Sequence, residues 1–352
     1  MAAPTERRFD RRDQETSLPF STMRRRVVCG LAGAGALTGC AGPRPSAVAA
    51  TQRTPLAWVV NERGGSLSLI DLRDERVVAT VPLGGRPRGL AVAAGGTRLL
   101  FADQTSGALR VLDTARRTMV GEVPLGRSPE AVYVSRDGTL AAVAVEEDNA
   151  VAFVDVRALQ VRFRVATEGE NPEHAVFSPD GRWVYVAAEN AEQVDVIDVA
   201  ARRQVAKVTV GRRPRGIGFS PDGARAWVAC ELSDEVHVID VRDHRPSGVI
   251  RVGTRAAGIT VMPDGATVFV SNGGDASVMV IDARESRVTA RIPVGQRPWN
   301  MALAPDGRRL LVACGRANAV SVVDVVQRRA TGVIAVGEMP WGVVVTETET
   351  SR

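Results

Sequence analysis

The sequence repeats itself about every 42 residues over most of its length. A proline follows a glycine-containing turn in each copy, and one copy has alanine instead; the positions are Pro87, Pro129, Pro172, Pro214, Ala256, Pro298 and Pro340. We call this series the proline ladder. A second series, the aspartate ladder, has the same spacing and its one extra residue in the same interval: Asp71, Asp113, Asp155, Asp198, Asp240, Asp282 and Asp324. A period of this length indicates a chain built from stacked copies of one supersecondary unit.

Each copy has the pattern of four short strands. In one copy, apolar runs at 215–219, 226–229, 235–239 and 248–252 are separated by turn signals, among them Ser220-Pro221-Asp222-Gly223. Proline fixes φ in such a turn and glycine accepts a positive φ. The ladder aspartates stand at the end of the third strand in every copy. This position favours a role in turn hydrogen bonds over a catalytic role. Four short strands in about 42 residues predict one blade of a β-propeller.

The two ends of the repeat predict how the ring closes. Six full copies begin at the ladder positions from 87 to 298, whereas the last proline is followed by one strand, 341–345. The segment 58–83 holds three strands and lacks the innermost one. The C-terminal strand would complete this N-terminal blade and leave no free edge. We therefore predict an all-β, seven-bladed propeller over 55–347, with a tail at 348–352.

Residues 1–40 have the features of an export signal. Three arginines after Met23, a possible start, precede a short apolar run that ends in Leu37-Thr38-Gly39-Cys40. Eleven apolar residues are too few to span a bilayer. The tetrapeptide resembles the lipobox of bacterial lipoproteins, which implies acylation of Cys40 and, with Ala41 next, the periplasmic side of the outer membrane. Both the general and the twin-arginine export routes fit. Residues 41–54 are predicted to be a flexible tether.

Recurring turns and strands carry a family resemblance over about residues 55–347. The Gly-x-x-Pro-x-Gly turn, the Ser-Pro-Asp-Gly turn and the Val-x-Val-Ile-Asp strand resemble the YVTN β-propeller repeats of exported bacterial and archaeal proteins. At the Tyr-Val-Thr-Asn position that names the family, this chain has variants such as Phe269-Val270-Ser271-Asn272 and Tyr185-Val186-Ala187-Ala188. The resemblance implies an extracytoplasmic propeller related to the haem d1 and pyrroloquinoline-quinone-associated families.

The charge balance argues against nucleic acid as a partner. The formal net charge is +5, but residues 1–40 hold seven arginines and four acids, so the remainder carries only +2. A nucleic-acid binder gathers its positive charge on one face. We expect a monomer attached to the membrane through Cys40, with nucleic acid an unfavoured alternative that would use arginines of the turns such as Arg88 and Arg215.

One face of the ring concentrates the candidate binding residues. In a four-stranded blade, the turn that enters strand one and the loop between strands two and three lie together, and we call this face the mouth. It would gather Arg86, Arg88, Glu130, Glu173, His174, Arg213, Arg215, Arg297, Trp299 and Trp341. Acidic loops from three adjacent blades would oppose arginines from the other side, so the mouth is predicted to be bipolar. The alternative to a binding role is that the polar loops are simply solvated and that the tryptophans pack along the inner strands.

The sequence offers few catalytic groups. His174 alone among three histidines falls at the mouth, without a companion for a metal site. Cys230 and Cys314 lie two blades apart, too far for a disulfide, and are predicted to be free, buried thiols.

The leading hypothesis is a scaffold that binds a periplasmic protein or a small anionic ligand, without cofactor or metal. The alternatives are a lactonase-like hydrolase using Glu173, His174 and a neighbouring arginine, or a haem or quinone propeller.

Overall fold

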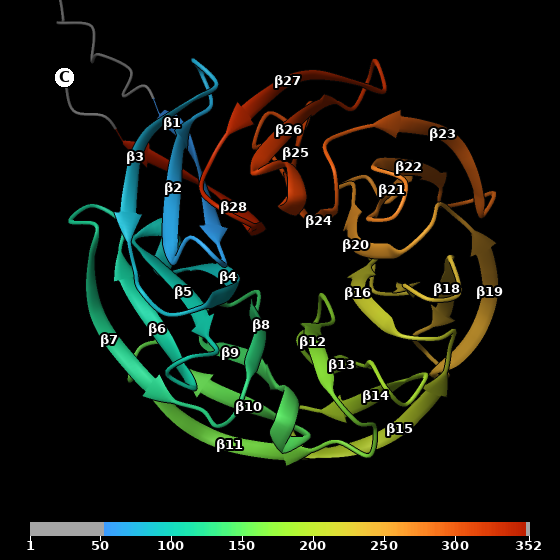
Figure 1. The fold of residues 1–352 in the computed structure, drawn as a ribbon. Coiled ribbons are helices and arrows are strands. Elements are labelled where there is room, and N and C mark those ends of the chain that lie inside the picture. The colour runs from blue at the N-terminus through green and yellow to red at the C-terminus, as the bar shows by residue number, and fades with distance from the viewer. Residues whose placement is uncertain (1–52, 350–352) are drawn as a thin grey trace, which may run out of the picture. The chain divides into compact units, whose positions relative to one another are not determined.

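The computed structural model describes residues 53–349, and the predicted export signal, tether start and Cys40 lie outside the described residues. The described chain forms seven four-stranded antiparallel sheets arranged as blades around a central axis (Figure 1). This confirms the predicted seven-bladed β-propeller.

Each blade runs from an innermost to an outermost strand. The closing blade consists of β28 (Pro340–Glu349), β1 (Arg53–Asn61), β2 (Ser66–Asp71) and β3 (Arg76–Pro82). The next two blades are β4 (Pro87–Ala93), β5 (Arg98–Asp103), β6 (Ala108–Asp113) and β7 (Thr118–Pro124), then β8 (Pro129–Val134), β9 (Leu140–Val145), β10 (Ala150–Asp155) and β11 (Gln160–Ala166).

The remaining four blades repeat this order. They are β12 (Pro172–Phe177), β13 (Trp183–Ala188), β14 (Gln193–Asp198) and β15 (Arg203–Thr209); β16 (Pro214–Phe219), β17 (Arg225–Cys230), β18 (Glu235–Asp240) and β19 (Arg245–Arg251); β20 (Ala256–Val261), β21 (Thr267–Asn272), β22 (Ser277–Asp282) and β23 (Arg287–Pro293); and β24 (Pro298–Leu303), β25 (Arg309–Cys314), β26 (Ala319–Asp324) and β27 (Arg329–Ala335). Short 3-10 turns occur at η1 (Ala94–Gly96), η2 (Glu146–Asp148) and η3 (Gly315–Ala317). No helix among the described residues is long and apolar enough to cross a membrane.

The C-terminal strand closes the ring as predicted. β28 pairs antiparallel with β1, and the ladder runs from Arg53 opposite Glu349 to Asn61 opposite Pro340. Trp58 Nε1 donates a hydrogen bond of 3.0 Å to Thr346 Oγ1 across this pair. The strands extend two residues beyond each predicted limit of the propeller, because pairing between the two ends continues into the expected tether and tail.

The turns explain the repeated polar residues. Asp222 Oδ1 accepts from Ser220 Oγ at 2.5 Å and from Ala224 N at 3.0 Å, while Gly223 has a φ of +72°. In the aspartate ladder, Asp282 Oδ1 accepts from two backbone N–H groups of the following turn, at 3.0 and 2.8 Å. These carboxylates cap turns, which agrees with the sequence interpretation.

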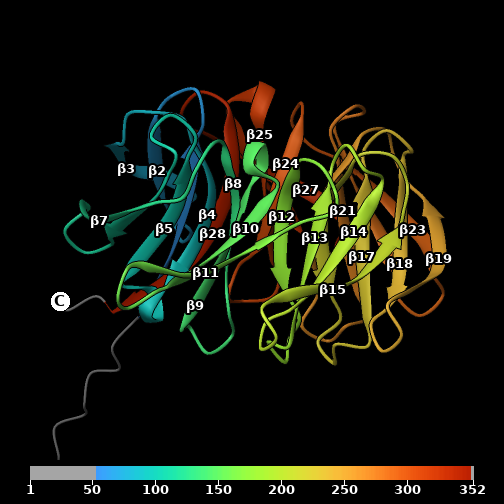
Figure 2. The ribbon, with the colours of Figure 1, turned by 90° about the horizontal axis from the view of Figure 1, so that it is seen from below.

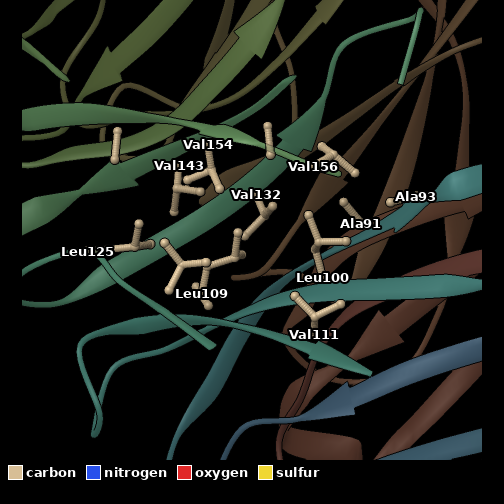
Figure 3. Packing of buried hydrophobic residues seen from close by; sticks show 14 of the residues in the cluster. Ala91, Ala93, Leu100, Leu109, Val111, Leu125, Val132, Val143, Val154 and Val156 are labelled. Carbon is tan, nitrogen blue, oxygen red and sulfur yellow. The ribbon is translucent and has the colours of Figure 1, made fainter. Parts of the chain in front are cut away.

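Apolar side chains between neighbouring blades form the core. Leu100, Leu109 and Val111 of one blade pack against Val132 and Val143 of the next (Figure 3). Each such fully buried side chain contributes roughly 1.5–3 kcal/mol. Near the axis the inner strands converge so closely that a Cβ on Gly89 would lie 2.5 Å from the Cα of Ala131. The glycine of the Pro-x-Gly motif is therefore needed because the inner strands pack too closely to leave room for a side chain at this position.

The two cysteines of the described chain are free and buried, as predicted. Burial raises the pKa of Cys230 to about 12, and burial also raises the pKa of Cys314. Neither thiol is poised for nucleophilic chemistry at neutral pH, because the thiolate is the reactive form.

Removing the closing strand tests the ring. A chain truncated after Gly337 loses β28, exposing the edge of β1 and opening the ring. We expect loss of the cooperative thermal transition in circular dichroism. A chain truncated after Glu349 keeps β28 and should melt like the full-length protein. Equal melting of all three chains would contradict this closure.

Candidate functional site

The residues that follow the ladder prolines form a ring at the mouth. In chain order from β4 to β28 they are Arg88, Glu130, Glu173, Arg215, Ala257, Trp299 and Trp341. Each lies at the start of an innermost strand, and these strands run between the two faces of the propeller (Figure 2). The predicted association of the two loop sets holds, since Gln104 N after β5 donates to Arg86 O before β4 at 3.1 Å.

Arg88 is held by acidic residues from three other blades. Its Nη2 lies 2.8 Å from Glu130 Oε2 and 3.5 Å from Glu173 Oε1, and its Nη1 lies 3.7 Å from Glu62 Oε1. The side chain of Arg88 is only 13% exposed and that of Glu130 only 3%. The guanidinium thus joins neighbouring inner strands by buried ion pairs.

Arg215 is the second centre of this network. Its Nη1 bonds Glu173 and lies 2.8 Å from Glu189 Oε1, while its Nε donates to Glu231 Oε2 at 2.8 Å. Arg297 Nη2 donates to the other oxygen of Glu231 at 2.8 Å. Glu231 is fully buried, which is tolerated because guanidinium groups occupy both of its oxygens.

Burial and pairing drive the carboxyl pKa values in different directions. Desolvation raises the pKa of Glu130 well above its ordinary value, and it also raises the pKa of Glu189, with the nearby Glu173 adding to both effects. Burial alone would raise the pKa of Glu231, but Arg215 and Arg297 outweigh it and the pKa lies below its usual range. The position of the arginines therefore decides which carboxyls stay ionised.

Positive and negative groups are interleaved at the mouth rather than separated into two sides. Glu231 belongs to the loops predicted to form the acidic side, yet it contacts Arg213, Arg255 and Arg297 as well as Arg215. Arg86, expected on the opposite side, pairs with Glu62 at 2.6 Å. The prediction of a bipolar mouth is wrong, because buried charges must find partners within hydrogen-bond reach.

Trp341 and His174 meet across the axis and close the channel below the ion pairs. They come from β28 and β12, which lie on opposite sides of the centre (Figure 1), and their ring centroids are 5.9 Å apart at 24°. Tyr133 of β8 joins them, with its hydroxyl 2.7 Å from His174 Nδ1. Arg88 lies over the Trp341 ring at 4.9 Å. We call Trp341, His174 and Tyr133 the axial plug.

The axial plug keeps His174 uncharged. The residue is 3% exposed, and burial, with the charges of Arg215 and Arg88, lowers the pKa of His174 to about 3. An imidazole with this pKa is a poor general base or acid near neutral pH. Among residues 53–349, no cluster of three or more His, Cys, Asp or Glu side chains could hold a metal ion.

The two mouth tryptophans have different surroundings. Trp341 is 3% exposed and belongs to an apolar cluster with Trp58 and Leu90, which matches the packing interpretation. Trp299 is half-buried, and Arg297 and Arg215 lie 4.1 and 5.3 Å from its ring centroid. Its faces are therefore engaged by the protein's own cations.

Sequence reasoning overlooked Tyr133 and Glu62. Tyr133 is four residues after a ladder proline, in a strand position that offered no chemical signal. Glu62 begins the loop between the second and third strands of the closing blade, as Glu231 begins the equivalent loop of its own blade, so this equivalence could have identified it.

Comparisons with known proteins place the fold among seven-bladed propellers. Residues 198–335 match the family model "Lactonase, 7-bladed beta-propeller", and residues 135–258 match "Cytochrome D1 heme domain". No curated protein matches the chain.

Solved structures agree with this fold. Hydrazine synthase of Kuenenia stuttgartiensis is similar at 21% identity, with a TM-score of 0.71, covering 76% of this chain and 92% of that one. A putative 6-phosphogluconolactonase from Bacteroides uniformis is similar at 20% identity and a TM-score of 0.71, covering 84% and 100%. The dihydro-haem d1 dehydrogenase NirN, solved in complex with DHE, has 16% identity and a TM-score of 0.62, covering 82% and 74%.

Replacing Arg215 should destabilise the whole propeller. Arg215→Met leaves the carboxyls of Glu173, Glu189 and Glu231 without their shared cation, and breaking buried pairs costs roughly 3–5 kcal/mol. We expect Tm in differential scanning calorimetry to fall by several degrees. Arg127→Met is the matched control, because Arg127 is 70% exposed at the same face and should change Tm little. Equal shifts in both variants would refute a central role for Arg215.

His174 should make the fold sensitive to acid. Its folded pKa of about 3 lies below the ordinary value of 6.5, so its contribution to stability is complete above pH 6.5 and declines as the pH falls toward 3. His174→Phe keeps a ring against Trp341 but cannot titrate. We expect the Tm difference between wild type and variant to shrink from pH 7 to pH 4.5. Parallel Tm curves would show that His174 does not titrate as the structure implies.

Proposed function

We propose that the protein is an exported, lipid-anchored propeller on the periplasmic side of the outer membrane, which docks a partner protein on its mouth. The observation that carries this proposal is that the charged centre is internally neutralised and buried. A centre of this kind offers rigidity rather than a free acid, base or nucleophile. A small anion would also have to displace carboxylates from Arg88 and Arg215, which makes it a weaker candidate than a protein.

The rim around the buried centre supports protein docking. Arg63, Arg127 and Arg255 are 68%, 70% and 53% exposed, and Glu147 and Glu338 are 58% and 57% exposed. Both signs of charge therefore face outward in fixed positions on short loops. Such a rim sets the orientation and the association rate of a complementary protein surface.

The direction of β1 places the start of the described chain on the face opposite the mouth. The loop that follows β1 lies at the mouth, because Glu62 N donates to Met339 O at 2.9 Å in the turn that enters β28. Arg53 begins β1 at the other end, on the face opposite the mouth.

Site-specific photocross-linking in the native cell envelope tests this function. A photoreactive residue at Arg127 or Arg255 should give one discrete protein adduct. The same residue at Arg157 or Arg284, which are exposed in turns of the opposite face, should not. Adducts from both faces alike, or from neither, would contradict mouth docking.

A lactonase-like hydrolase is the second candidate. It is favoured by the partial family match and by the raised pKa values of Glu130 and Glu189 beside Glu173, since perturbed carboxyls gather at active sites. Turnover of 6-phosphogluconolactone that is lost in Glu173→Gln and kept in Glu338→Gln would support it. The neutral, engaged His174 argues against the role that the sequence suggested for it.

A haem at the mouth does not fit the residues present. The axis is occupied by the rings of Trp341 and His174, both 3% exposed, and His174 Nδ1 is bonded by Tyr133. The other two histidines lie elsewhere, His237 beside Glu235 and His244 bonded to Tyr185. No histidine of the described chain thus presents an open site for iron on the axis.

A further inference from the structure

The seven blades do not carry the same residue at the start of the mouth loop between their second and third strands. In five blades this residue has a carboxyl or amide side chain, and these residues are Glu62, Gln104, Glu146, Glu189 and Glu231. In the remaining two blades it is Gly273 or Gly315. The neighbouring blades β20–β23 and β24–β27 therefore lack a group that the rest of the ring supplies at this level.

Arginines of the turns that enter the blades pair with this group in a regular way. In three cases the arginine just before a position of the proline ladder pairs with the glutamate of the preceding blade: Arg86 with Glu62 at 2.6 Å, Arg213 with Glu189 at 3.2 Å, and Arg255 with Glu231 at 3.5 Å. The next arginine of this series is Arg297. The position where its partner would stand is Gly273, which has no side chain to offer.

Arg297 instead shares a carboxylate from two blades away. Its Nη1 lies 2.9 Å from the place that a Cβ on Gly273 would take, and its Nη2 donates to Glu231 Oε1 at 2.8 Å. Arg255 Nη1 lies 3.5 Å from that same oxygen. Burial, together with the charges of Arg215 and Arg255, lowers the pKa of Arg297 although Glu231 is so close. Positive charge is thus in excess at this point of the mouth.

The surrounding loops add a further cation and little acid. Arg316 is exposed and has no ion-pair partner among residues 53–349. The acid in the mouth loops of these two blades is Asp275, and its carboxylate already lies 3.7 Å from Arg291. Arg255 is 53% exposed, so a group from another molecule can reach it. We call Arg255, Arg297 and Arg316 the arginine sector.

We propose that the protein docked at the mouth places an acidic side chain in the arginine sector, beside Gly273, where it pairs with Arg255 and Arg297. The partner is therefore a protein with an acidic segment at its contact surface. This inference rests on the proposed docking function and specifies the chemistry of the partner. The partner's carboxylate supplies the group that Gly273 lacks, and the planar guanidinium group binds carboxylates through paired hydrogen bonds.

Two peptides test the charge requirement. The probe is the hexapeptide Gly-Glu-Asp-Glu-Asp-Gly, blocked at both ends and labelled with tetramethylrhodamine, and its control has Gln and Asn in place of Glu and Asp. Fluorescence anisotropy with the full chain should show saturable binding of the acidic peptide. We expect the amide peptide to bind at least about tenfold more weakly, because charge-assisted hydrogen bonds are lost. The affinity for the acidic peptide should fall as salt is added.

Variants at the sector separate charge from shape. Gly273→Glu gives Arg297 a carboxylate of its own chain and should weaken the acidic peptide about tenfold, whereas Gly273→Gln has the same size and should weaken it less. The three atoms nearest to a Cβ at this position all belong to the Arg297 side chain, which can move. Arg255→Gln should weaken the peptide about fivefold. Arg284→Gln, in an exposed turn of the opposite face, is the control and should leave the affinity unchanged.

Three results would overturn the acidic segment. The first is equal binding of the two peptides, or no saturable binding of either. The second is a set of Gly273→Glu and Arg255→Gln chains that bind the acidic peptide as tightly as Arg284→Gln does. The third is displacement of the labelled peptide by glutarate, a small dicarboxylate, at the same concentration as by unlabelled peptide, which would assign the sector to a small anion.

The docking function itself is judged separately, by photocross-linking from Arg127. A discrete protein adduct there, together with an acidic peptide that does not bind, would keep docking at the mouth and remove only the acidic segment. Adducts from neither face would remove the docking function, whatever the peptide does.

Discussion

The pairing of β28 with β1 is the constraint on which the rest of the structure depends. Each sheet has apolar side chains on both faces, so every blade needs two neighbours, and only a closed ring supplies them. The same strand carries Trp341 to the axis, where it meets His174 from the opposite side. Closing the ring and closing the channel at the mouth are therefore achieved by one segment, taken from the far end of the chain.

A closed ring also brings charged residues of different blades close together at the mouth. Inner strands converge toward the axis, so the first residue after each proline is driven into a small, poorly hydrated space. Arginine and glutamate are tolerated there only as partners, which is why Arg88 and Arg215 each contact several carboxyls. The outcome is a centre that holds its blades together and a rim that retains exposed charge.

Most of the fold and part of the site could be predicted from the sequence. The proline and aspartate ladders count the blades, and the missing inner strand near the N-terminus identifies the partner of the C-terminal strand. The same period places Arg88, Glu173 and Arg215 at one level of the mouth. Which charge pairs with which could not be predicted, because side-chain reach across neighbouring blades decides it, as Arg297 and Glu231 illustrate.

The contact of His174 with Trp341 could not be predicted from the sequence, for a related reason. These residues are 167 positions apart in the sequence and three blades apart in the ring, and neither proline ladder nor strand pattern relates them. The sequence favoured a structural or solvated histidine, with a catalytic role as the alternative, but it could not show the burial that lowers the pKa of His174.

Native mass spectrometry of the mature protein, released gently from its own envelope, tests the central claim most directly. A protein-docking propeller anchored at Cys40 should appear as an acylated chain in a one-to-one complex with a second polypeptide. Charge reversal at Arg127 and Arg255 should leave the acylated chain by itself. A wild-type spectrum with only the single propeller chain would contradict the account.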